Sequence, residues 1–389
     1  MHVKRFLHNL LSSSIHGKRL NTLCSFVDVL IKEKQLSLTK LGRALKNKVQ
    51  EKNNIKRCDR FLGNKHLHKE RQGIYKKVAY QLIGDVKRPL LLVDWSHVPN
   101  TTHYLLRASL VAKGRALSIY EEVFTQQYEN SNKAHRVFLK HLKSVLPEMC
   151  CPILITDAGF YNAWFRLVLR EGWDYIGRIR GNVCYQLDDN ERWEYYSDSI
   201  KKATEQGQFL GSGTVSKADP IKTHLYLIKL ARKYRTRFNK YKKKAISKKD
   251  KAYSKSAKAP WLLATSLENP SSSNEIFFLY SKRMQIEQNF RDLKSSRYGF
   301  GFEYAYSKSI ERIQVLLMIA MIATLIAYLT GLVAEVNQSH YQFQANTIKN
   351  RRVLSLFYLG CQIIKKRIKF YIHNDKIFST LRMELPCIL

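Results

Sequence analysis

Three carboxylates in this 389-residue chain occur at positions where the neighbouring residues make a negative charge unexpected. Asp94 interrupts the apolar run PLLLVDWSH, and Asp157 ends a second apolar run in PILITDAGFY. A buried charge is costly unless it is paired or bound to a metal. Glu287 lies much later, among the cations of YSKRMQIEQNFRDLKS. Converging carboxylates bind hard divalent cations, so these residues predict a site for two Mg²⁺ ions about 4 Å apart that acts on phosphodiester bonds.

The segment around Glu287 is predicted to form one helix that runs from Tyr280 to Ser295. At about 100° per residue, four of its side chains fall within an arc of roughly 60°: Tyr280, Arg283, Glu287 and Lys294. Arg291 lies about 20° outside this arc, whereas Asp292 points away from it and is expected to face solvent. A separate apolar stripe can dock on a sheet and hold Glu287 over the two aspartates; it consists of Leu279, Ile286, Phe290 and Leu293.

Each acid also has a structural interpretation. A single buried aspartate is often a hydrogen-bonded structural residue, so Asp94 alone would leave the question open. His97 could approach the site from three residues further on, but a lone histidine beside a strand is more often structural. The three acids taken together favour a catalytic interpretation.

The elements that must position the acids follow from the spacing of apolar residues. After Pro89 the pattern predicts three strands, a helix, a strand, a helix and a strand, at residues 89–97, 104–114, 115–124, 132–147, 152–161, 162–172 and 174–181. From about Val183 the chain is predicted to form the strands of a separate insertion, and APWLLATSL resumes strand character before the Glu287 helix. An α/β core interrupted by an insertion is therefore expected.

Two segments have competing interpretations. Residues 232–258 hold thirteen Lys or Arg and a single acid, a composition that could order on a phosphate backbone or simply remain solvated. Residues 315–334 are apolar for long enough to cross a bilayer, for which roughly 20 residues suffice. A fully buried helix in a large domain has the same all-round hydrophobicity, and we expect that alternative here.

The composition favours a nucleic acid as partner. The chain has 67 Lys and Arg against 31 Asp and Glu, a formal net charge of +36, and these cations are spread over its whole length. Membrane-surface binding usually uses one basic helix or cluster instead. The seven cysteines form no C-x-x-C pair, so neither a disulfide framework nor a zinc site is indicated, and a reducing cytoplasm fits. The N-terminus is a poor match to a signal peptide.

Residues 1–85 are predicted to be helical and basic, with no strand signal. Ser37 is a plausible N-cap, and Gly63 is a plausible stop for a helix that carries Lys56, Arg57 and Arg60. This part of the chain could be a helical DNA-binding module or a solvated pair of basic helices. The charge of the whole chain favours DNA binding.

The acids and cations together resemble a known family. The order Asp94, Asp157 and Glu287, with the spacing Tyr-x2-Arg-x3-Glu-x6-Lys and the string FRDLKS, is similar to the DDE transposases of bacterial insertion sequences. Within these the chain resembles the insertion-sequence-four family, and most closely the branch of the transposon-ten transposase. The resemblance is strongest from Asp94 to about Tyr304 and weakest over residues 311–389.

The resemblance implies an α/β, ribonuclease-H-like catalytic core with a β-rich insertion, flanked by helical regions. The expected domains are a helical DNA-binding domain, the first part of the core, a β-rich basic insertion, the last part of the core with the Glu287 helix, and a C-terminal helical region, at 1–85, 86–182, 183–260, 261–310 and 311–389.

It also implies cut-and-paste transposition of the element that encodes the protein. Water attacks at the transposon end, the freed 3′-hydroxyl closes a hairpin on the opposite strand, the hairpin reopens, and the 3′ end joins target DNA. Mg²⁺ is the expected cofactor, held by Asp94, Asp157 and Glu287, and Mn²⁺ is expected to substitute. By carry-over from relatives, Tyr280, Arg283 and Lys294 hold phosphates and Trp261 stacks on a flipped base, unless Trp261 is a core residue.

The expected partners are double-stranded DNA, with transposon-end inverted repeats and target DNA, bound by a homodimer. No membrane association is expected; the location would be the bacterial cytoplasm, at the nucleoid. Arg291 is a further candidate DNA contact that could link DNA binding to catalysis, because it lies close to the helix face that holds Glu287 and Lys294. Three alternatives stay open: a ribonuclease-H-like nuclease or resolvase that cuts without joining, a non-catalytic DNA-binding relative, and a membrane protein with a basic cytoplasmic domain.

Overall fold

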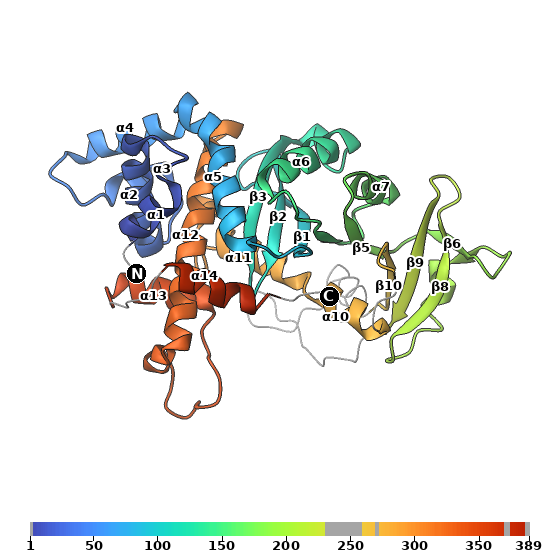
Figure 1. The fold of residues 1–389 in the computed structure, drawn as a ribbon. Helices are drawn as coiled ribbons and strands as arrows, with labels where there is room; N and C mark the ends of the chain where they lie inside the picture. Colours follow the sequence, from blue (N-terminus) through green and yellow to red (C-terminus); the bar gives the residue numbers. More distant parts are fainter. Residues whose placement is uncertain (1–2, 230–258, 269–271, 369–373, 386–389) are drawn as a thin grey trace, which may run out of the picture. The chain divides into compact units, whose positions relative to one another are not determined.

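The computed structural model describes residues 3–229, 259–268, 272–368 and 374–385, and divides the chain into two compact units (Figure 1). Unit 1 comprises Met1–Pro152 and Met284–Leu389, and unit 2 comprises Ile153–Arg283. Both units contain helices and strands, so the mixed α/β class is confirmed, and it is consistent with the expected ribonuclease-H-like core. The basic tract of residues 232–258 lies outside the described residues.

Unit 1 begins with five helices, which confirms the helical character expected for residues 1–85. These are α1 (Val3–Leu11), α2 (Gly17–Glu33), α3 (Leu38–Arg43), α4 (Glu51–Leu62) and α5 (Lys65–Ile83). The predicted cap is confirmed, because the Ser37 hydroxyl accepts a hydrogen bond from the Lys40 amide at 3.3 Å and so satisfies one of the free donors at the start of α3. Gly63 follows the last residue of α4, as expected.

Three antiparallel strands follow in unit 1: β1 (Leu90–His97), β2 (His103–Val111) and β3 (Ala116–Thr125). Their ladder pairs Asp94 with Arg107 and Arg107 with Glu121. Directly paired residues of neighbouring strands project to the same face of a sheet. An acid, a base and a second acid therefore form one row across the three strands.

The centre of unit 1 is α12 (Ile310–Val336), which contacts α2, α5 and β3 (Figure 1). Its length and composition would allow it to cross a membrane, but 94% of its most apolar window is buried inside the protein. The expectation of a buried core helix is confirmed. Two further helices, α13 (Leu356–Lys365) and α14 (Asn374–Met383), pack against it. Gly360 allows the close approach of α13, since a Cβ there would lie 1.7 Å from the carbonyl oxygen of Ala327.

The segment around Glu287 forms two helices, so the prediction of one helix from Tyr280 to Ser295 is wrong. Helix α10 (Ser273–Ser281) belongs to unit 2, and α11 (Met284–Lys294) belongs to unit 1. The amides of Lys282 and Arg283 bond to carbonyls three residues back, the tight pattern with which a helix ends. No glycine or proline marks this break in the sequence. The rotation of a single helix therefore no longer supports one arc that includes Tyr280 and Arg283 with Glu287.

Unit 2 contains the remaining strands, in the order β4-β5-β10-β9-β8-β6-β7. Strands β4 (Ile153–Thr156) and β5 (Asp174–Ile179) are parallel and joined through α7 (Asn162–Arg170), and the other pairs are antiparallel. The rest are β6 (Cys184–Leu187), β7 (Glu194–Tyr195), β8 (Gln208–Val215), β9 (Ile221–Ile228) and β10 (Trp261–Thr265), with the short helix α8 (Tyr196–Ser199). Within the described residues, the expected strand character is confirmed at β6, β7, β9 and β10.

A buried histidine joins β1 to α6 (Asn132–Val145) in unit 1. The Trp95 indole N–H donates to Nε2 of His135 at 3.2 Å, and burial lowers the pKa of His135 to about 4. Because the unfolded chain binds a proton near pH 6.5 and the folded chain does not, stability is present above that pH and is lost as the pH falls towards 4.

We expect this histidine to make the protein acid-sensitive. Between pH 7.5 and pH 5, urea unfolding should show that the wild-type protein loses about 2 kcal/mol more stability than His135→Gln, whose amide oxygen can accept the same indole N–H. His66→Gln, which changes an exposed ring, is the control and should follow the wild type. Equal pH dependence in the wild type and His135→Gln would contradict the prediction.

Candidate active site

Asp94 lies near the end of β1 with its side chain half-buried. One carboxylate oxygen accepts a hydrogen bond from the Trp95 amide at 2.9 Å. The three leucines and the valine before it are buried, and the residues after it become progressively exposed. The Asp94 carboxylate therefore lies at the point where β1 passes from the interior to the surface.

Glu287 lies in the first turn of α11 and is exposed. A carboxylate in the first turn of a helix is favoured by the free amides and the positive end of the helix dipole. An adjacent face of α11 is buried through Ile286, Phe290 and Leu293, and the helix packs on β1 and β3. These three members of the predicted apolar stripe are confirmed, whereas Leu279 belongs to α10.

Lys294, in the last turn of α11, is a cation that is held at the end of the strand that carries Asp94. Its ammonium donates to the Ser96 hydroxyl at 2.8 Å and to the His97 carbonyl, so it is anchored on the last residues of β1. Burial and the nearby Arg107 lower the pKa of Lys294 to about 8, and attraction to Asp94 opposes this shift. Unit 1 thus places Asp94 and Lys294 together and carries Glu287 on the same helix as Lys294.

His97 has a structural contact, in agreement with the expectation for a lone histidine. Its Nε2 is 2.7 Å from the carbonyl oxygen of Thr101, across the turn that connects β1 to β2. The ring also meets Tyr104 edge to face. Both contacts hold the turn that begins where Lys294 is anchored.

Asp157 follows the last residue of β4, in unit 2. One of its carboxylate oxygens accepts the Gly159 amide at 2.8 Å, which fixes the side chain in a turn before α7. Its position directly after a buried strand is the one that the sequence predicted, and its side chain is half-buried. Its convergence with Asp94 and Glu287 stays a prediction, because those residues belong to unit 1.

The other predicted DNA contacts of unit 2 are Tyr280, Arg283 and Trp261. Tyr280 is buried at the end of α10, and its ring meets that of Trp261 edge to face with 4.9 Å between centroids. Trp261, the first residue of β10, is half-buried. Arg283 lies in the turn that ends α10. Their contacts with phosphates and with a flipped base stay predictions.

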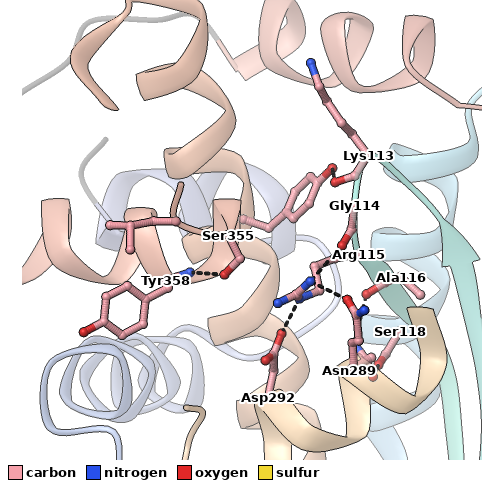
Figure 2. A network of polar contacts seen from close by, with 12 residues as sticks. Lys113, Gly114, Arg115, Ala116, Ser118, Asn289, Asp292, Ser355 and Tyr358 are labelled. Atoms are coloured by element: carbon pink, nitrogen blue, oxygen red, sulfur yellow. Dashed lines mark hydrogen bonds and ion pairs between the residues drawn. The ribbon is translucent and has the colours of Figure 1, made fainter. Parts of the chain in front are cut away.

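Asp292 is buried, so the expectation that it faces solvent is wrong. Only 4% of its surface is exposed, and its carboxylate pairs with Arg115 at 2.7 Å (Figure 2). Burial raises the pKa of Asp292, and the charge of Arg115 opposes this rise. The physical reason is a long-range contact, because the β2–β3 turn brings Arg115 against the helix face that rotation alone assigned to solvent.

Asn289 and Arg107 fix α11 on the strands, a role that the sequence reasoning missed. The Asn289 amide donates to the Ala116 carbonyl at 2.9 Å (Figure 2). Arg107 donates to the Asn289 side chain and pairs with Glu121, and both members of this pair are almost fully buried. Tyr75 on α5 donates to the same glutamate at 2.9 Å. A signal was present, because Arg107 interrupts the apolar strand YLLRASLVA as Asp94 interrupts its own.

The donors present fit a hard divalent cation in their chemistry, since Asp94, Asp157 and Glu287 offer carboxylate oxygens. Among the residues that the structure describes, no group of three His, Cys, Asp or Glu side chains is gathered closely enough to hold a metal ion. The sharing of a metal ion by Asp94, Asp157 and Glu287 therefore stays a prediction.

Comparison with protein-family models matches residues 85–326 to the transposase DDE domain, which is more than half of the chain. The match begins just before β1 and ends within α12, so it includes all three acids. Comparison with curated proteins finds no match.

Proposed function

Since the chain belongs to the family of DDE transposases, we propose that it moves its own insertion sequence by a cut-and-paste route with a hairpin intermediate. We also propose that it belongs to the insertion-sequence-four family, in the branch of the transposon-ten transposase. The observation that carries the proposal is the arrangement in unit 1, where Lys294 anchors the end of α11 beside Asp94 and the first turn of the same helix presents Glu287.

The residues of this arrangement divide into metal ligands and phosphate contacts. Asp94 and Glu287, together with Asp157, would hold Mg²⁺, which when bound activates a water or 3′-hydroxyl and stabilises the leaving oxygen. Lys294 is held in place by Ser96 and His97, so its charge is already positioned for the reacting phosphate. Little conformational entropy is then lost when the phosphate binds. Arg291, exposed on α11, is proposed to contact the neighbouring phosphates, and Tyr280, Arg283 and Trp261 the DNA end.

The N-terminal helices support a separate grip on DNA. Lys52, Lys56 and Arg60 are exposed on α4 at intervals of four residues, so they form one cationic stripe along the helix. Lys46 and Lys48, in the connection from α3, are exposed as well. A stripe of this kind follows a phosphate backbone, and we propose that residues 1–85 bind the inverted repeats, with the protein acting as a homodimer that joins two ends.

The test is a reaction of the whole protein with Mg²⁺ and linear DNA that carries both ends of its element. The expected products are excised fragments with a hairpin at each end, whose covalently joined strands do not separate on a denaturing gel, and their later joining to a target plasmid. Mn²⁺ should support the same reaction and EDTA should stop it. Nicked strands without hairpins or joined products would favour the nuclease alternative and overturn the proposal.

A further inference from the structure

Three exposed tyrosines follow α11 within nine residues of one another. Tyr298, Tyr304 and Tyr306 are 49%, 44% and 75% exposed. We call these three residues the tyrosine platform. A large ring on the surface gains little from packing, so three of them in one short segment point to a binding surface.

The backbone beneath the platform is held firmly. Phe300 and Phe302 are buried between the tyrosines, and the Phe300 amide donates to the Asp292 carbonyl at 2.8 Å. The carboxylate of Glu303 accepts the Ser296 amide at 2.7 Å and closes the turn after α11. A Cβ at Gly299 would lie 1.8 Å from the Asp292 carbonyl oxygen, so the segment turns back tightly against the helix. The exposed rings thus stand on an ordered support.

The platform is tied to the strand that carries Asp94. The Asn100 side chain, in the β1–β2 turn, donates to the carbonyls of Glu303 and Ala305 at 2.8 and 3.0 Å. Lys294 donates to the His97 carbonyl at the start of the same turn. The contacts therefore run from the tyrosine segment through one turn to the candidate active site, all within unit 1.

Cations accompany the tyrosines. The guanidinium groups of Arg291 and Arg297 lie 5.5 and 5.1 Å from the centre of the Tyr298 ring, and both arginines are exposed. Lys308 is exposed beyond Tyr306. Glu303 is the acid within this segment, and its carboxylate is engaged by the Ser296 amide. Exposed rings with interleaved cations match the chemistry of a strand that offers both bases and phosphates.

We propose that the tyrosine platform binds an unpaired strand of DNA beside the site of cleavage, with bases stacked on the rings and phosphates against Arg291 and Arg297. This inference rests on the proposed function and assigns a new surface to it. The bases of a paired duplex are already stacked on one another, so only unpaired bases can present their faces to these rings. The platform therefore distinguishes an opened end from a closed one.

The experiment compares two fluorescent DNAs by anisotropy, using the full chain: a paired duplex end, and the same end with a short single-stranded extension. We expect the double variant Tyr298→Ala/Tyr306→Ala to bind the extended end roughly tenfold more weakly than the wild type, because base stacking on two rings is lost. Binding to the paired end should change less than about twofold. Both rings are exposed, so the melting temperature should hold.

Two control variants sharpen the result. Tyr298→Phe/Tyr306→Phe keeps the rings and should bind both DNAs like the wild type. Tyr195→Ala removes a similarly exposed ring from β7 in unit 2 and should leave both affinities unchanged. If the phenylalanine variant lost as much affinity as the alanine variant, the rings would not be the binding element, and the inference would fail.

The remaining outcomes separate this inference from the proposed function. A wild-type protein that cleaves and joins DNA, with an alanine variant that binds both DNAs normally, would overturn the platform alone. If the alanine variant lost equal affinity for the paired and the extended ends, base stacking would not explain the loss, and the inference would also fail. A wild-type protein that binds neither DNA and cleaves neither would overturn the platform and the proposed function together.

Discussion

Replacing Glu287 with glutamine is expected to lower DNA cleavage on the order of 10³-fold or more and to leave end binding intact. Glutamine keeps the size and polarity of the side chain but removes the negative charge that would hold a divalent cation. Glu287 is exposed in the first turn of α11, so the fold should lose less than about 1 kcal/mol. A gel assay for cleavage and a binding assay on the same preparation check both parts.

Glu311→Gln is the matched control. Glu311 is also an exposed glutamate in the first turn of a helix of unit 1, where its carboxylate accepts the Ser309 hydroxyl at 2.6 Å. Its replacement should leave cleavage unchanged. Asp94→Asn and Asp157→Asn are expected to match Glu287→Gln, since asparagine can still accept the amide hydrogen bonds of Trp95 and Gly159. Full cleavage activity in Glu287→Gln, Asp94→Asn or Asp157→Asn would show that the residue replaced is not catalytic.

Replacing Arg107 with methionine is expected to destabilise the protein by about 3–5 kcal/mol. The change leaves the Glu121 carboxylate buried without the charge that compensates it, since only 1% of this side chain is exposed. It also removes the guanidinium from its position 4.7 Å from the Phe290 ring on α11. Urea unfolding followed by circular dichroism measures the loss, which should appear as a lower midpoint.

Two comparisons isolate the buried charge from the lost packing. The double variant Arg107→Met/Glu121→Gln removes both charges and should recover a substantial part of the stability. Arg43→Met breaks an ion pair with Glu51 in which both side chains are about 60% exposed, and should cost less than about 1 kcal/mol. If Arg107→Met cost no more than Arg43→Met, the buried row would not stabilise unit 1 as we infer.

Local patterns predicted most of the elements in the described residues. The buried strands β1 and β4 follow from continuous apolar runs, and α6 follows from its periodic apolar residues. Strand β8 was not predicted, because QFLGSGTV has two glycines and no regular alternation, and it is held by pairing with β6 and β9. The break between α10 and α11 was missed because no residue with a special backbone preference marks it.

The candidate site divides in the same way. Asp94, Asp157 and Glu287 could be selected from the sequence, because a charge in or beside an apolar run is a local anomaly that one chain displays by itself. Arg107 gave the same local signal, yet its role depends on Glu121 and Asn289, which reach it only through the strand ladder and the packing of α11.

The sequence by itself determined the types of residue, the caps, the apolar periods and the charge, because these depend on neighbours within a few positions. Only the tertiary structure decided that Asp292 pairs with Arg115, that Lys294 is anchored on Ser96 at the end of β1, and that α12 is a core helix. The physical reason is that burial and ion pairing depend on partners far away in the chain, whose positions are set by packing.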